Sequence, residues 1–139
     1  MDDLRLLGVR GLLLDVDNFK QTNDRYGHPK GDVVLRCLGE NLSGLFRRDD
    51  VVGRVGGDEF LMMMPGAGGE QAVGRARKIA QEMCRSVSVQ CGVDVSGSIG
   101  VVLSKPGACA YEELLRRADS ALYAAKAAGK GCYRVYGGA

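Results

Sequence analysis

The sequence predicts a domain of the α+β class, with a central five-stranded, mostly antiparallel sheet flanked by helices. Two apolar runs, residues 51–55 and 59–64, are separated by a Gly-Gly bend as in a β-hairpin. Elsewhere, segments with apolar residues at helical spacing alternate with short apolar runs that are typical of buried strands. Because a hairpin interrupts this alternation, the sheet is not expected to be wholly parallel.

The remaining elements follow from local patterns. Residues 11–16, GLLLDV, are a short apolar run, and residues 95–103 alternate between apolar and smaller or polar side chains. We expect strands at residues 11–16, 51–55, 59–64, 95–103 and 132–136. We expect helices at residues 30–48, 72–83 and 111–128, with a short helical or turn segment at residues 19–28. Gly129 follows the last helix as a C-terminal capping glycine does, and a further strand near residues 86–90 is left open.

Size and composition describe one globular domain. The chain has 139 residues, of which 45% are hydrophobic and 26% charged. A net charge of +2 gives no support for bulk binding to nucleic acid or to a membrane, and no apolar run approaches the roughly 18 residues of a membrane span. Five scattered cysteines without a C-x-x-C pair argue against a disulfide framework or a zinc site. We therefore expect a cytoplasmic domain that contacts neither nucleic acid nor membrane.

Acidic residues gather at two predicted strand ends. Asp15 and Asp17 end the first strand. Asp58 and Glu59 lie at the bend of the hairpin. If both elements lie side by side in one sheet, these oxygens converge at one edge, and oxygen ligands without His or Cys are what Mg²⁺ prefers. The glycines of the bend are then backbone that a bulky ligand approaches closely. The alternative is a glycine hairpin with solvated acids, and these residues alone do not decide between the two.

Four longer motifs occur in a fixed order along the chain. They are Asp-x-Asp-x-Phe-Lys from Asp15, Asn-Asp-x-x-Gly-His-x-x-Gly-Asp from Asn23, Gly-Gly-Asp-Glu-Phe from Gly56 and Ala-Asp-x-Ala-Leu-Tyr-x-Ala-Lys from Ala118. Together they closely resemble the GGDEF domain of diguanylate cyclases. The resemblance implies a fold similar to the palm of nucleotidyl cyclases and some polymerases. It also implies that two domains, each holding one GTP, face each other across a two-fold axis and condense the two GTP into cyclic di-GMP with release of two pyrophosphates.

The resemblance assigns the acidic residues to metal binding and catalysis. Asp15 and Asp58 match the family's metal-binding carboxylates, with the Val16 carbonyl as a further ligand. Two Mg²⁺ or Mn²⁺ ions per active site would polarise the phosphates and help to ionise the attacking 3′-hydroxyl. Glu59 matches the second acid of the motif and is expected to be essential, either as the base or as an additional metal ligand.

The resemblance also implies where the nucleotide binds. The implied substrate-binding residues are Asn18, Phe19, Asn23, Asp32, Gly56, Gly57, Lys126 and Lys130. Asn23 and Asp32 would hydrogen-bond the guanine edge and reject adenine, which would leave these polar groups unpaired. Backbone N–H groups around Asn18 and Phe19 would cradle the phosphates, as a helix start does.

Two lysines complete the implied phosphate site. Lys126 and Lys130 match the basic residues that bind the terminal phosphates. The second position is more often Arg in the family, and Lys keeps the charge but loses the bidentate fork, so we expect a weaker grip on phosphate. The alternative for Lys126 is a cation that only favours a helix C-terminus.

Upstream of the bend, Arg47-x-x-Asp50 matches the offset of the family's allosteric inhibitory site for cyclic di-GMP. Arginine can fork onto phosphate and stack on guanine, while a carboxylate accepts from guanine N–H groups. By itself the motif would more often be a solvated charge cluster. The candidates for a partner cation in this site are Arg75, Arg77 and Lys78.

Partners follow from the same resemblance. We expect a homodimer for catalysis, GTP as substrate, cyclic di-GMP as product and inhibitor, and an upstream sensory or regulatory domain in a longer parent protein. Residues 1–139 are expected to be a single GGDEF domain with too few residues before the first strand for the family's usual N-terminal segment. A cyclic di-GMP-binding or GTP-binding regulatory module without cyclase activity is the alternative function.

Overall fold

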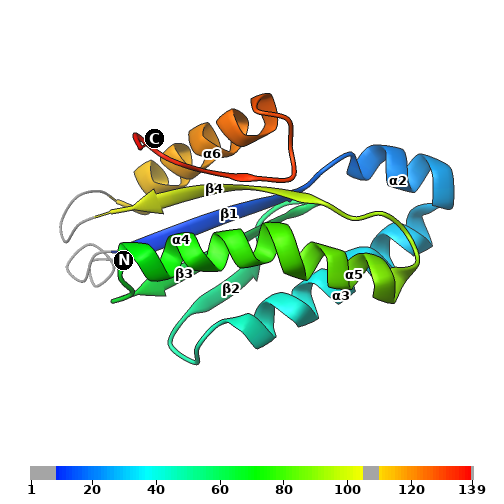
Figure 1. Cartoon of the computed structure of the whole chain (residues 1–139), viewed down its shortest axis with the longest axis horizontal. Helices are drawn as coiled ribbons and strands as arrows, with labels where there is room; N and C mark the ends of the chain where they lie inside the picture. Colours follow the sequence, from blue (N-terminus) through cyan, green and yellow to red (C-terminus); the bar gives the residue numbers. More distant parts are fainter. Residues whose placement is uncertain (1–8, 105–109, 139) are drawn as a thin grey trace.

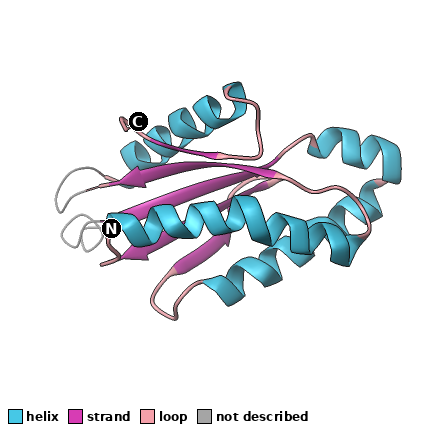
Figure 2. Cartoon of the chain, viewed as in Figure 1, coloured by secondary structure: helices cyan, strands magenta, loops and turns pink. Residues whose placement is uncertain are grey.

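The computed structural model describes residues 9–104 and 110–138, and the expectation about the N-terminal segment concerns residues outside this part. A five-stranded sheet has the order β2-β3-β1-β4-β5 (Figures 1 and 2). Its strands are β1 (Val9–Val16), β2 (Val51–Arg54), β3 (Glu59–Pro65), β4 (Gly97–Leu103) and β5 (Tyr133–Val135). Every pair is antiparallel except β4 with β5, which is parallel. The predicted five-stranded, mostly antiparallel sheet is confirmed.

Helices cover both faces of this sheet. They are α2 (Phe19–Tyr26), α3 (His28–Leu45), α4 (Gly69–Lys78), the π-helix η1 (Ile79–Met83), α5 (Cys84–Cys91) and α6 (Tyr111–Ala127). Leu12 and Leu14 of β1 are buried in the larger core, with α3 and the α4–η1–α5 helices. Leu13 faces the opposite way, into a smaller core with α6 (Figure 1). Because neighbouring strand residues point to opposite faces, a strand covered on both sides reads as a continuous apolar run.

The further strand considered near residues 86–90 is wrong, because these residues belong to α5. The sequence Ser-Val-Ser-Val alternates like a strand, but Val87 is fully buried and Val89 is 80% exposed. Cys84, Val87 and Cys91 are the buried residues of this helix, at the spacing of one helical face. The Ser88 hydroxyl donates to the Cys84 carbonyl at 2.8 Å, a bond to the preceding turn that serine commonly makes in helices.

Gly100 explains how closely α6 lies on the sheet. A Cβ at this position of β4 would fall against the backbone oxygen of Ala118 and the backbone nitrogen of Leu122. Only glycine lets helix and strand backbones approach in this way. The contact places the C-terminal end of α6, with Lys126, beside the end of β1. Within the described residues, none of the helices combines the length and apolar character needed to cross a membrane.

Candidate active site

The end of β1 and the bend of the β2–β3 hairpin meet at one edge of the sheet. Asp15 lies opposite Glu59 in the antiparallel register of β1 and β3. One residue further, the Val16 N–H donates to the carbonyl oxygen of Asp58 at 3.1 Å. The sequence predicted that the acids of these two elements converge, and the strand pairing confirms it. We call Asp15, Asp58 and Glu59 the acidic edge.

Arg54, at the end of β2, holds the bend in place. Its Nη2 donates to the Gly57 carbonyl at 2.6 Å, and its Nε donates to the Gly56 carbonyl at 3.3 Å. The Val55 N–H also donates to the Glu59 carbonyl at 3.0 Å across the bend. Sequence reasoning gave Arg54 no role, although the arginine directly precedes the bend. The sequence did hold a signal for this role: an arginine, with a long side chain of several donors, stands just before a glycine turn whose carbonyl groups need hydrogen-bond partners.

The glycines of the bend have different surroundings. A Cβ on Gly56 would lie 2.9 Å from Oε1 of Glu59, so a side chain here would displace the Glu59 carboxylate. A Cβ on Gly57 would meet no atom within 4 Å. Gly56 therefore makes room for Glu59 itself, while Gly57 leaves open space on the outer side of the bend.

Asp15 is held in a partly desolvated position. Its Oδ2 lies 3.0 Å from Nζ of Lys126, while its Oδ1 is buried and has no hydrogen-bond partner in the protein. Burial raises the pKa of Asp15, the Lys126 ammonium lowers it, and the nearby Asp58 carboxylate raises it again. For Glu59, burial also raises the pKa most, followed by the charges of Asp15 and Asp58. The acidic edge therefore concentrates negative charge that the protein neutralises only in part.

Asp17, two residues further along, has the opposite surroundings. Its side chain is buried, and both of its oxygens accept hydrogen bonds. Oδ1 accepts from the Ser98 hydroxyl at 2.6 Å and from Lys126 Nζ at 3.2 Å. Oδ2 accepts from the Ser96 hydroxyl at 2.7 Å and from the Gly131 N–H at 2.9 Å. We call these four partners with Asp17 the Asp17 junction. Sequence reasoning placed Asp17 among the converging acids but did not foresee that it would be saturated by donors.

Asn18 and Lys130 meet where the implied phosphate site would lie. Asn18 has φ 55° and Lys130 has φ 66°, and they are the only non-glycine residues with positive φ among those described. Nζ of Lys130 donates to Oδ1 of Asn18 at 2.8 Å. A left-handed residue followed by a helical one, here Asn18 and Phe19, is a backbone sequence that can turn successive N–H groups toward one anion. This backbone agrees with the expected phosphate cradle, and such unfavourable conformations tend to persist at functional sites.

The two residues expected to read guanine lie on neighbouring helices, Asn23 on α2 and Asp32 on α3. The Asn23 side chain points at Gly31, where a Cβ would collide with its Oδ1. That Oδ1 is buried and has no hydrogen-bond partner in the protein. Asp32 follows Gly31 in α3 and is exposed. A buried, unpaired amide oxygen next to an exposed carboxylate agrees with a site that a ligand completes.

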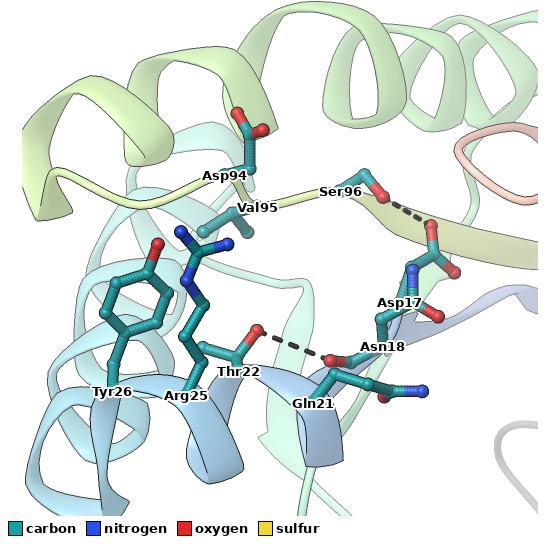
Figure 3. A pocket seen from close by; sticks show the side chains of 9 residues that line it. All are labelled: Asp17, Asn18, Gln21, Thr22, Arg25, Tyr26, Asp94, Val95 and Ser96. Atoms are coloured by element: carbon teal, nitrogen blue, oxygen red, sulfur yellow. Dashed lines mark hydrogen bonds between the residues drawn. The ribbon is translucent and has the colours of Figure 1, made fainter.

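A cavity of about 470 Å³ lies on another face of α2 (Figure 3). Its lining residues are Asp17, Asn18, Gln21, Thr22, Arg25, Tyr26, Asp94, Val95 and Ser96. The guanidinium of Arg25 lies 5.2 Å from the centre of the Tyr26 ring, and both side chains extend from α2 toward Val95 (Figure 3). Neither Asn23 nor the acidic edge lines this cavity. The cavity and the expected guanine site are therefore separate.

The Arg47-x-x-Asp50 motif forms a tight turn between α3 and β2. The Arg47 N–H donates to Oδ2 of Asp50 at 2.8 Å, and the Asp50 N–H donates to the Arg47 carbonyl at 3.0 Å. Of the three candidate partner cations, Arg75 has its guanidinium 5.1 Å from the centre of the ring of Phe46, the residue directly before this turn. Arg77 instead contacts the Tyr133 hydroxyl at 3.5 Å.

The acidic edge fits a divalent cation that is shared with a substrate. In the part of the chain that the structure describes, no three His, Cys, Asp or Glu side chains are grouped to hold a metal ion by themselves. Mg²⁺ commonly binds through one or two carboxylates and substrate phosphates, and it keeps several waters. Asp15, with a buried oxygen that lacks a partner, and the adjacent Asp58 supply such a pair.

The five-stranded sheet with acids at one edge agrees with the palm-like fold that the sequence motifs implied. The family model described as "Diguanylate cyclase, GGDEF domain" matches residues 8–132. The chain belongs to this family, as its motifs predicted.

Relatives and solved structures agree with this assignment. Diguanylate cyclase TpbB of Pseudomonas aeruginosa is 39% identical over 127 residues, which are 89% of this chain and 29% of the relative. The active GGEEF domain of a diguanylate cyclase from Vibrio cholerae has a TM-score of 0.84 at 31% identity, covering 93% of this chain and 83% of that chain. The GGDEF domain of DgcB from Caulobacter crescentus, in complex with c-di-GMP, has a TM-score of 0.83 at 27% identity, covering 94% and 79%. The chain spans about a third of the length of the curated relatives it matches.

Proposed function

We propose that this domain is the catalytic domain of a diguanylate cyclase, which condenses two GTP into cyclic di-GMP and two pyrophosphates. One observation carries the proposal most directly. The backbone bond from Val16 to Asp58 brings the acids of the GGDEF bend against Asp15, whose Oδ1 is buried without a protein partner. Family membership and the intact motifs support the same activity.

Asp15, Asp58 and the Val16 carbonyl are proposed to hold divalent cations, Mg²⁺ or Mn²⁺. When bound, the cations would polarise the phosphates and favour ionisation of the 3′-hydroxyl. Glu59 lies beside Asp15 in the register of the sheet and has a raised pKa, so it is well suited to carry a proton during the reaction. Glu59 as an additional cation ligand remains the alternative role, and its position next to Asp15 serves either.

The nucleotide is proposed to bind along α2. Asn23 and Asp32 would take the guanine edge, and the unpaired Oδ1 of Asn23 would gain a donor from the base. The N–H groups at Asn18 and Phe19 would hold phosphate oxygens. Lys126 and Lys130 would then turn from their protein partners to the terminal phosphates.

Assembly and control are proposed from the same site. One domain carries one set of nucleotide-binding residues, so joining two GTP requires a second copy facing it, and we propose a homodimer. Cyclic di-GMP is proposed to inhibit through Arg47 and Asp50, with Arg75, which lies over the Phe46 ring next to this turn, as the partner cation. The c-di-GMP complex of the DgcB domain supports product binding by a domain of this family. A sensory or regulatory domain and a cytoplasmic location are proposed for the longer parent protein.

The test is to incubate the chain with GTP and Mg²⁺ and to detect cyclic di-GMP by chromatography. Asp58→Ala is expected to abolish synthesis, because it removes one cation ligand, while cyclic di-GMP binding at the Arg47 turn is retained. Arg47→Ala is the matched variant, and it should keep synthesis and lose product inhibition. Product binding without synthesis, also in a longer chain extended at the N-terminus, would instead establish the regulatory module.

A further inference from the structure

Lys126 reaches the acidic edge from the far end of the chain. Its Nζ lies 3.0 Å from Oδ2 of Asp15 and 3.2 Å from Oδ1 of Asp17, and the side chain is only 25% exposed. Partly buried charges are screened less than charges at the surface. The ammonium therefore neutralises the same carboxylate that the proposed function assigns to a divalent cation.

The two oxygens of Asp15 are not equivalent. Oδ2 is taken by Lys126, whereas Oδ1 is buried and has no protein partner. Lys126 also contacts Asp17, and the carboxylate of Asp17 is held in place by Ser96, Ser98 and the Gly131 N–H. Lys126 is thus anchored at Asp17 and extends over one of the two positions at which Asp15 can bind a cation.

We propose that Lys126 is a resident counter-ion: in the nucleotide-free domain it keeps divalent cations off Oδ2 of Asp15, so that of the two oxygens only Oδ1, which has no protein partner, remains for them. An ammonium and a divalent cation at the same oxygen repel each other strongly, so they exchange and do not share it. Nucleotide phosphates offer Lys126 another anion and so release Oδ2. Through Lys126, the binding of nucleotide phosphates would therefore allow a divalent cation to bind Oδ2 of Asp15 as well as Oδ1. The inference rests on the proposed function, because it assumes that Asp15 binds the cation.

The experiment measures Mn²⁺ binding to the nucleotide-free 139-residue chain, by the electron paramagnetic resonance signal of free Mn²⁺. Lys126→Met is expected to bind Mn²⁺ on the order of tenfold more tightly than the wild type, because a positive charge next to Asp15 is removed. Lys126→Arg keeps the charge and should bind like the wild type. Lys130→Met is the matched control: it removes the same charge from the neighbouring loop, but Lys130 bonds Asn18 and not a carboxylate.

The outcomes separate the inference from the proposed function. Equal Mn²⁺ affinity for Lys126→Met and the wild type overturns the counter-ion role and leaves the metal site standing. The same tightening in Lys130→Met also overturns it, because the effect would then be one of net charge. Absence of Mn²⁺ binding in all variants at millimolar concentration removes the metal site as well. Circular dichroism checks folding, and Lys126→Gln, which can still bond Asp17, replaces Lys126→Met if the latter does not fold.

Discussion

Asp15 of the acidic edge and Asp17 of the junction are two residues apart, at the end of β1 and directly after it, yet their carboxylates have opposite surroundings. Within the junction, burial alone would raise the pKa of Asp17, but hydrogen bonds from Ser98, Ser96 and Gly131 lower it. At the edge, burial raises the pKa of Asp15 and of Glu59, and neighbouring acids raise both further. The chain around the end of β1 therefore carries one carboxylate whose oxygens both accept hydrogen bonds and another with one oxygen that has no protein partner.

This difference shows how a partly unpaired carboxylate can be held in a stable structural frame. The junction ties β1 to β4 and to the loop after α6, since Asp17 contacts Ser96, Ser98 and Gly131. With these elements fixed, Asp15 keeps its position although one of its oxygens is buried without a partner. Asp17 thus stabilises the structure around Asp15, of which Oδ2 is paired with Lys126 and Oδ1 has no protein partner.

The strongest test of this difference is to neutralise Asp15 and Asp17 separately. Asp15→Asn is expected to lower cyclic di-GMP synthesis about 100-fold or more, while the free energy of unfolding stays equal or rises, because burial and the Asp58 charge disfavour the ionised carboxylate more than Lys126 favours it. Asp17→Asn is expected to lose about 2–3 kcal/mol of unfolding free energy, because an amide N–H₂ would face at least one of the present donors. Urea unfolding and chromatography measure the two effects. Equal stability losses in both variants would contradict the distinction.

A variant of Arg54 tests whether the positions of the acids at the edge also depend on the Gly56–Gly57 bend. Arg54→Ala removes the bonds to the carbonyls of Gly56 and Gly57, so Asp58 and Glu59 are held less firmly. We expect synthesis to fall about tenfold, with less than about 1 kcal/mol lost in unfolding free energy, because these bonds are exposed. Arg85→Ala, which removes an exposed arginine from α5, is the matched control and should change neither. A stability loss larger than the activity loss would assign Arg54 to folding alone.

The smallest expected effect is a difference in pH dependence. The pKa of Asp17 is lowered below its ordinary value of 3.8, so its stabilisation is complete above about pH 3.8 and is lost as the pH falls through the folded-state pKa. The pKa of Asp15 is raised above 3.8, so ionising it costs stability as the pH rises above that value. Urea unfolding at several pH values should show that Asp17→Asn removes the acidic loss and that Asp15→Asn removes the opposite slope. Parallel curves for both variants would refute the assigned directions.

The sequence predicted the sheet and the meeting of its acids because both follow from local patterns. An apolar run, a Gly-Gly bend and helical spacing are readable within short windows, and the motif order defined the family. The environment of Asp17 was not readable, because its partners Ser96, Ser98 and Gly131 are distant in the chain and are ordinary residues by themselves. Alternating valines suggested a strand where α5 lies, because the periodicity of so few residues does not distinguish a strand from a helix. The Lys126 contacts with Asp15 and Asp17 depend on the docking of α6, which no local pattern encodes.

The parallel pairing of β4 and β5 has a consequence for how the protein is made. The start of β4 lies beside the end of β1. Because α6 runs back along β4 before β5 begins, the last turn of α6 lies close to the acids at the end of β1. The bond from Lys126 to Asp17 spans 109 residues. On the ribosome, where chains grow from the N-terminus, the acids of β1 therefore emerge long before their lysine does. Until the last helix is synthesised and docks, the nascent domain carries this cluster of carboxylates without its internal cation.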